Sequence, residues 1–99
     1  MMVDKLTLES FQPFLNQTFH VQFDPPYPYE LTLVECKPIQ VTGGNSSREP
    51  FRLLFIGIPD PFLPQRIYRL ANEQIGTVDL FLVPLGPDQR GMRYESIFT

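Results

Sequence analysis

The chain of 99 residues is long enough for one domain only, and 42% hydrophobic residues are sufficient for one modest core, so we expect a single domain over residues 1–99. Its 11 Pro, 6 Gly and 13% aromatic residues, with only 19% charged residues, exclude a disordered chain or a coiled coil and indicate a turn-rich globular domain. A net charge of −3, with Arg and Lys scattered singly, excludes the basic stripe that nucleic-acid binding needs.

The first predicted element is a short helix near the N-terminus. The Thr7 hydroxyl can cap its first turn, and Pro13 limits it to a turn or two. Four apolar residues recur there at helical spacing: Leu8, Phe11, Phe14 and Leu15. We expect this segment to act as a helical plug.

Two strands follow, separated by a rigid connector. Residues Phe19–Phe23 alternate apolar and polar side chains, the two-residue period of a strand with one buried face. The connector Asp24–Pro28 contains three prolines, which supply no ladder donors. The second predicted strand spans Tyr29–Lys37, and Pro38 closes it or marks an edge or bulge.

A polar loop and a strand with two apolar faces come next. The stretch Thr42–Arg48, with Gly43–Ser47 at its tip, predicts a hairpin loop. The return strand Phe51–Ile58 contains four consecutive apolar residues, so both of its faces need cover. The extended connector Pro59–Pro64 follows, and we expect its Phe62 and Leu63 to fold back as a lid over one end of the core.

The C-terminal third predicts two further turns and three strands. A strand over Gln65–Ala71 leads into a short turn, Asn72–Gly76, where Gly76 is free to take positive φ. The fifth strand, Thr77–Leu85, ends in the hairpin loop Gly86–Gly91. The last strand, Met92–Phe98, is expected to pair antiparallel with the fifth.

Six antiparallel strands without any β-helix-β spacing predict a mainly β fold, as a small barrel or a sandwich with a short N-terminal helix. Two strands, around Leu53–Ile56 and Val78–Val83, are apolar on both faces. Their outer faces are covered either by the N-terminal segment or by another subunit, and both alternatives stay open.

Residues that could carry catalysis or bind a metal are few. With one His and one Cys, a zinc site would need carboxylate ligands, and none lies at short spacing from His20. Cys36 on an apolar strand face is typical of a packed small hydrophobe rather than a nucleophile. Asp79 lies in an apolar strand and is expected to form an ion pair with Arg69 or Arg93. We predict no catalytic residue, metal site or cofactor.

An aromatic cluster flanks the two proline-rich connectors and is the candidate interaction surface. Its members are Tyr27, Tyr29, Phe62 and Tyr68. Together with the prolines they could form a rigid apolar ledge for a peptide or another subunit. The alternative is that they pack as a lid on the core.

Several motifs together carry a family resemblance over nearly the whole chain. They are Leu8-Glu9-Ser10-Phe11, Phe14-Leu15-Asn16-Gln17-Thr18-Phe19, Phe51–Phe55, Ile67–Leu70, Gly76, Leu80–Pro84 and Tyr94–Phe98. With them the chain resembles a family of small, uncharacterised bacterial proteins of this length, a domain of unknown function. It departs from the family at Asn16, where a small residue is usual. The resemblance implies no assigned catalytic residues, and some members lie near genes for phage-tail collar-type fibre proteins, which hints at a role in structure or assembly.

Two functional hypotheses follow. The first is a non-enzymatic structural or assembly module, accessory to a phage-tail-like or fibre protein, that docks a protein partner or a second copy. The second is a small binding barrel for an apolar ligand or peptide, with a cavity lined by Phe19, Phe55 and Phe81. The single Cys36 and the lack of an apolar run of signal or membrane-spanning length predict a cytoplasmic protein without a membrane partner.

Overall fold

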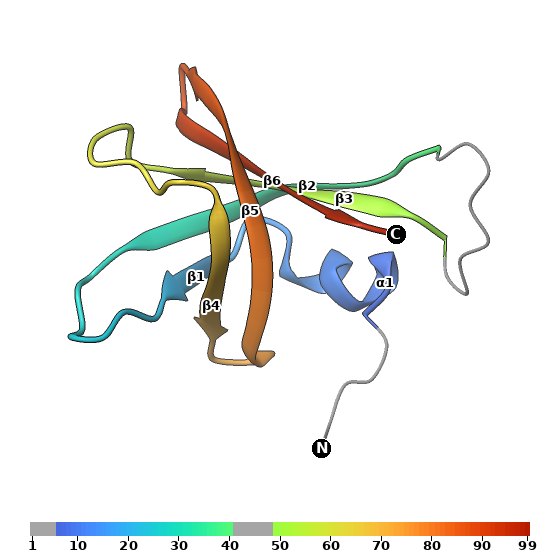
Figure 1. The fold of residues 1–99 in the computed structure, drawn as a ribbon. Coiled ribbons are helices and arrows are strands. Elements are labelled where there is room, and N and C mark those ends of the chain that lie inside the picture. The colour runs from blue at the N-terminus through green and yellow to red at the C-terminus, as the bar shows by residue number, and fades with distance from the viewer. Residues whose placement is uncertain (1–5, 41–48) are drawn as a thin grey trace.

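The computed structural model describes residues 6–40 and 49–99, and within them six antiparallel strands form one sheet that closes in a ring (Figure 1). Around the ring the order is β1-β2-β3-β6-β5-β4. The elements are α1 (Leu8–Phe11), a 3₁₀ turn (Gln12–Phe14), β1 (Thr18–Val21), β2 (Glu30–Pro38), β3 (Phe51–Gly57), β4 (Arg66–Asn72), β5 (Gly76–Asp88) and β6 (Gly91–Phe98). The predicted mainly β fold of six antiparallel strands with a short N-terminal helix is confirmed. Of the two predicted arrangements, the structure has one closed sheet and not a sandwich of two packed sheets.

The helix begins where its capping residue was predicted. The Thr7 hydroxyl accepts the Ser10 N–H at 3.3 Å, and the Ser10 hydroxyl accepts the Thr7 N–H at 3.0 Å. Phe11 is fully buried, with its ring 6.1 Å from that of Phe51 and 5.6 Å from that of Phe98. The helix is therefore a plug that adds to the core.

The first two strands differ from their predicted limits. β1 ends at Val21 rather than at Phe23, although Gln22 beyond it still donates its N–H to a neighbouring strand, at the Arg69 carbonyl. In β2 a register shift lies between Leu33 and Glu35. It allows Leu33 and, three residues later, Cys36 both to pack toward the core, which strict alternation would forbid.

At Leu54 the outer face of β3 is covered by side chains of its own sheet and not by the N-terminal helix, whose Phe11 packs in the core. Leu54 is buried, and its cross-strand neighbours are Glu35 on β2 and Glu95 on β6. The Arg52 guanidinium binds both carboxylates, at 2.6 Å and 3.0 Å, beside Leu54. Arg52 also lowers the pKa of Glu35, mainly through this hydrogen bond.

On β5 the predicted alternation is confirmed, with Leu80 and Leu82 inside. Phe81 points outward and is 47% exposed, so the expectation that it lines an internal cavity is wrong. The other two residues named for that cavity do lie inside: the rings of Phe19 and Phe55 pack edge to face at 5.5 Å.

The turns are tighter than predicted. β5 continues to Asp88, so the hairpin loop shrinks from Gly86–Gly91 to the residues between Asp88 and Gly91, where the Asp88 carboxylate accepts the Arg90 N–H at 2.7 Å. At the other hairpin Gly76 has the expected positive φ, +84°. The predicted loop Gly43–Ser47 lies outside the described residues.

Candidate interaction surface

The two proline-rich connectors lie on the same side of the closed sheet, away from α1 (Figure 1). One joins β1 to β2 through Asp24–Pro28, and the other joins β3 to β4 through Pro59–Pro64. Because each proline has a fixed φ, both connectors are stiff. We call this region the proline–aromatic end.

Of the four aromatic residues predicted for this surface, two belong to a lid on the core. Tyr29 and Tyr68 are only 4% and 6% exposed. The Tyr29 hydroxyl donates to the Pro61 carbonyl at 2.6 Å, and that of Tyr68 donates to the Pro64 carbonyl at 2.5 Å. They therefore hold the second connector over the sheet and offer almost no ring surface to a partner.

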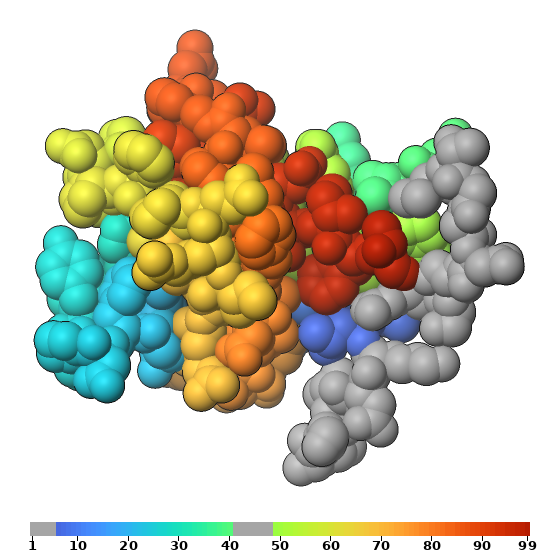
Figure 2. Space-filling view, in the orientation of Figure 1, coloured from blue at the N-terminus to red at the C-terminus, as the bar shows by residue number. Residues whose placement is uncertain are grey.

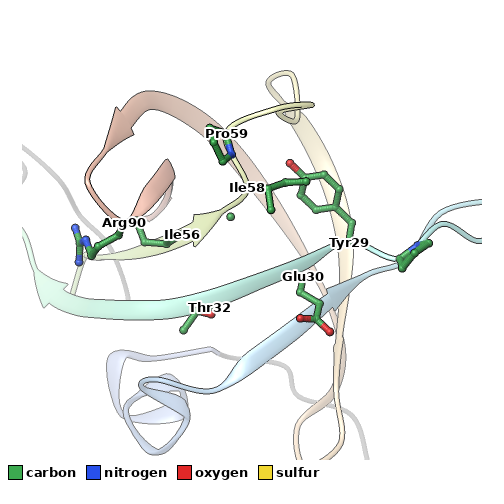
Figure 3. A pocket seen from close by; sticks show the side chains of 9 residues that line it. Tyr29, Glu30, Thr32, Ile56, Ile58, Pro59 and Arg90 are labelled. Carbon is green, nitrogen blue, oxygen red and sulfur yellow. The ribbon is translucent and has the colours of Figure 1, made fainter.

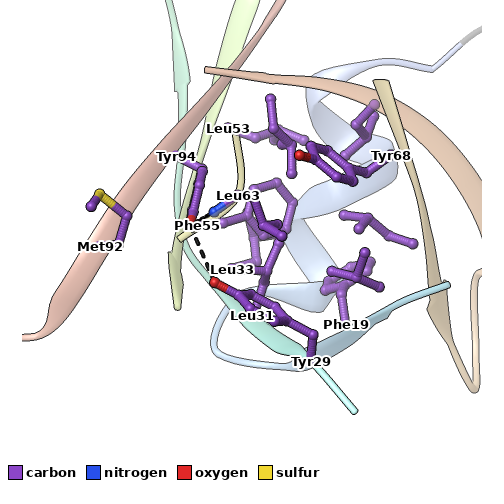
Figure 4. Packing of buried hydrophobic residues seen from close by; sticks show 14 of the residues in the cluster. Phe19, Tyr29, Leu31, Leu33, Leu53, Phe55, Leu63, Tyr68, Met92 and Tyr94 are labelled. Carbon is purple, nitrogen blue, oxygen red and sulfur yellow. Dashed lines mark hydrogen bonds between the residues drawn. The ribbon is translucent and has the colours of Figure 1, made fainter. Parts of the chain in front are cut away.

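Tyr94 of β6 completes the lid network. It is fully buried, its hydroxyl accepts the Leu63 N–H at 2.7 Å, and it lies 3.3 Å from the Tyr29 hydroxyl (Figure 4). Burial, with a smaller contribution from the neighbouring Tyr94, raises the pKa of Tyr29 far above its ordinary value. Of the two connector residues that were predicted to fold back as a lid on the core, Leu63 is buried, whereas Phe62 is 52% exposed, so the prediction is wrong for Phe62.

The other two predicted residues, Tyr27 and Phe62, are 53% and 52% exposed. Phe23 supports Tyr27 from below, with ring centroids 6.2 Å apart, and also contacts the rings of Tyr29 and Tyr68 edge to face. This central role of Phe23 was not predicted from the sequence. Phe23 continues the apolar alternation of β1 two residues after Val21, and this pattern could have predicted that its ring faces the core.

A groove opens beside this aromatic cluster, where β2 and β3 diverge (Figure 3). It has a volume of about 480 Å³. Four apolar side chains line it: Pro28, Ile56, Ile58 and Pro59. Ile58 is 48% exposed, so the groove presents apolar surface to solvent. A second hollow of about 320 Å³ lies against the same Pro28 and is bordered by Tyr27.

The main chain of Glu30 borders the groove. Val21 N–H donates to the Tyr29 carbonyl and Leu33 N–H to the Gln17 carbonyl, so odd-numbered residues of β2 direct their main-chain groups toward β1. Glu30 therefore directs its own N–H and C=O toward β3, yet the ladder between β2 and β3 begins only at Thr32 and Ile56. The Glu30 carbonyl oxygen lies 3.5 Å from the point where a Cβ on Gly57 would stand, so these polar groups face the end of β3 at the groove.

Charged side chains lie at two margins of the groove (Figure 3). Arg90 binds Asp88 at 2.8 Å, and this contact lowers the pKa of the Asp88 carboxyl. Glu30 lies 3.8 Å from the imidazole of His20. The groove thus has an apolar floor, polar main chain on one wall, and a charge of each sign at its margins.

The residues weighed for catalysis do not meet. His20 pairs with Glu30, and Cys36 lies six residues further along β2, about 20 Å away at the rise of a strand. Burial, with a smaller contribution from Glu35, raises the pKa of the Cys36 thiol to about 11, so the thiol is protonated at neutral pH.

Asp79 forms the ion pair predicted for it. Its carboxylate accepts the Arg69 Nε–H at 2.9 Å, and the pKa of Asp79 is lowered mainly by this hydrogen bond. Of the two predicted partners Arg69 is therefore the one used; Arg93 instead donates to the carbonyls of Gly86 and Leu85.

Within the described part of the chain, no three His, Cys, Asp or Glu side chains gather as metal ligands would. Over residues 6–40 and 49–99, no helix has the length and apolar character needed to cross a membrane.

Comparison with known proteins identifies the family. A family model described as a domain of unknown function, DUF6916, matches residues 6–98. No curated protein and no solved structure matches the chain. Because the model spans almost the whole sequence, the chain belongs to the DUF6916 family.

Proposed function

We propose that this member of the DUF6916 family is a non-enzymatic protein-interaction module that takes up an extended segment of a partner protein in the groove at the proline–aromatic end. The observation that carries this proposal is the divergence of β2 and β3, which leaves the main chain of Glu30 facing a groove with an apolar lining.

An extended peptide fits this chemistry because it offers both kinds of group that the groove can bind. Its main chain can pair with the N–H and C=O of Glu30, as in the addition of a strand to a sheet. Alternate side chains of the peptide would then pack on Ile56 and Ile58, between the prolines of the two connectors. The stiff connectors lower the entropy lost on binding, which favours affinity from a small contact.

The identity of the partner is proposed from the sequence resemblance. Relatives that lie near genes for phage-tail collar-type fibre proteins favour a partner from a phage-tail-like or fibre assembly. The module would then serve as an accessory of that assembly, and we place the encounter in the cytoplasm, where a single free thiol such as Cys36 stays reduced.

Selection of peptides tests the proposal. A library of random linear peptides is selected against the full chain, and the tightest peptide is labelled and titrated by fluorescence anisotropy. We expect Ile58→Asp to weaken binding by about tenfold or more, because it places a charge on the apolar floor. Phe81→Asp is the matched control, since Phe81 has almost the same exposure and lies on the outer face of β5.

Three results would contradict the proposal that the groove binds a peptide. The first is that no peptide is selected. The second is that Ile58→Asp binds the peptide as the natural chain does, and the third is that Phe81→Asp weakens binding as much as Ile58→Asp. Unchanged circular dichroism of both variants shows that any loss of binding comes from the surface and not from unfolding.

A further inference from the structure

A second apolar surface lies on the outer face of β4 and β5. Ile67 of β4 and Phe81 of β5 are directly opposite each other across the two strands. They are 66% and 47% exposed, whereas the alternate residues Tyr68 and Leu80 are buried in the core. In Figure 2, β4 in gold and β5 in orange lie side by side on one face of the molecule.

The next cross-strand pair on this face carries one charge of each sign. Arg69 lies opposite Asp79, and their side chains form an ion pair at 2.9 Å while remaining 62% and 51% exposed. A rung of Ile and Phe is thus followed by a rung of Arg and Asp. We call these four residues the β4–β5 outer face.

We infer that the β4–β5 outer face binds the same face of a second copy of this chain. A two-fold axis that runs along the strands exchanges β4 of one copy with β5 of the other. Ile67 then lies against Phe81 of the second copy, and Arg69 lies against its Asp79. Every apolar group meets an apolar group and every charge meets its opposite, which is the self-complementarity that a two-fold interface requires.

Aligned packing of two sheets is a common arrangement, with strand directions within about 30° of each other and side chains filling the space between the sheets. The four side chains cover on the order of a few hundred Å², well below the roughly 800 Å² per partner of a standard interface. We therefore expect a reversible dimer with a Kd in the micromolar range or weaker. The inference is independent of the groove, which lies at the proline–aromatic end.

The mass of the full chain in solution, measured by sedimentation velocity from micromolar to millimolar concentration, tests the inference. The natural chain is expected to shift from monomer to dimer over this range, and Phe81→Asp is expected to remain monomeric. Ile58→Asp, which alters the groove, is expected to dimerise as the natural chain does.

Exchanging the charges of Arg69 and Asp79 distinguishes a loss of dimer contacts from a loss of folding. Arg69→Asp alone puts like charges face to face and is expected to weaken the dimer by about tenfold. The double variant Arg69→Asp/Asp79→Arg restores opposite charges across the two-fold axis and is expected to recover the dimer. A chain that is monomeric at all concentrations, a Phe81→Asp variant that still dimerises, or a double variant that does not recover would each overturn the inference.

Discussion

Replacing Tyr94 by Phe removes one hydroxyl from the centre of the lid network and keeps the ring in the core. The Tyr29 hydroxyl gives its proton to the Pro61 carbonyl. The proton of Tyr94 is therefore directed to the Tyr29 oxygen, while the Tyr94 oxygen accepts the Leu63 N–H. The substitution consequently breaks two hydrogen bonds and leaves the buried N–H of Leu63 without its acceptor.

The cost follows from these two losses. A hydrogen bond contributes about 1 kcal/mol net, and a buried donor left without a partner costs about 1–3 kcal/mol. We expect Tyr94→Phe to lower the free energy of unfolding by about 2 kcal/mol. For a domain of this size, this corresponds to a decrease in Tm of roughly 8–16 °C. Urea unfolding followed by far-ultraviolet circular dichroism measures it without a tryptophan probe, which this chain lacks.

Two other tyrosines provide graded controls. Tyr68→Phe removes one hydrogen bond to the Pro64 carbonyl and should cost about 1 kcal/mol. Tyr27→Phe alters a ring that is half exposed and should change stability by less than about 0.5 kcal/mol. If Tyr94→Phe costs no more than Tyr27→Phe, the network does not hold the connector and the reasoning is refuted.

Three more predictions concern the sheet. Arg52→Met should cost about 1 kcal/mol at pH 7. The difference should narrow as the pH falls below 4.5, because the lowered pKa of Glu35 gives a contribution that is present above that pH and lost on protonation; urea midpoints at several pH values test this. The raised pKa of Tyr29 gives a contribution to stability that is complete below pH 10.0 and is lost as the pH rises above it, so the urea midpoint should fall as the pH is raised above 10.0, and should fall less in Tyr29→Phe. Gly91→Ala should cost about 2 kcal/mol or more, since its Cβ would collide with a main-chain carbonyl of β3, whereas Gly76→Ala, also at positive φ but in open space, should cost only about 1 kcal/mol; thermal unfolding of both variants compares them.

Features with a local signal in the sequence could be predicted. The alternation in Met92–Phe98 places Tyr94 and Ser96 inside, and the structure buries both. Thr7 caps the helix through its own hydroxyl, and Asp79 in an apolar strand pairs with Arg69. Each of these depends on residues a few positions apart or on the cost of an unpaired charge.

Features set by distant parts of the chain could not be predicted. The ring closes where Gln22 N–H donates to the Arg69 carbonyl, between residues 47 positions apart, and no local pattern marks that contact. The burial of Tyr29 and Tyr68 depends in the same way on where the second connector crosses the sheet, because the carbonyls of Pro61 and Pro64 are the acceptors. A sequence with proline-rich connectors beside tyrosines is compatible both with an exposed ledge and with a lid on the core. In the structure Tyr29 and Tyr68 belong to the lid, whereas Tyr27 and Phe62 are exposed.

Closure of the sheet explains why the two proposed surfaces lie where they do. A closed sheet has only one interior face, and successive side chains of a strand point to opposite faces. A strand that is apolar on both faces must therefore direct some apolar side chains outward. On β3 the ion pairs of Arg52 surround Leu54 and bury it, whereas on β5 the side chain of Phe81 remains 47% exposed. At the proline–aromatic end, Ile58 is left exposed in the groove because the ladder with β2 has already ended. Ile58→Asp and Phe81→Asp therefore perturb separate surfaces, and each proposal can fail while the other stands.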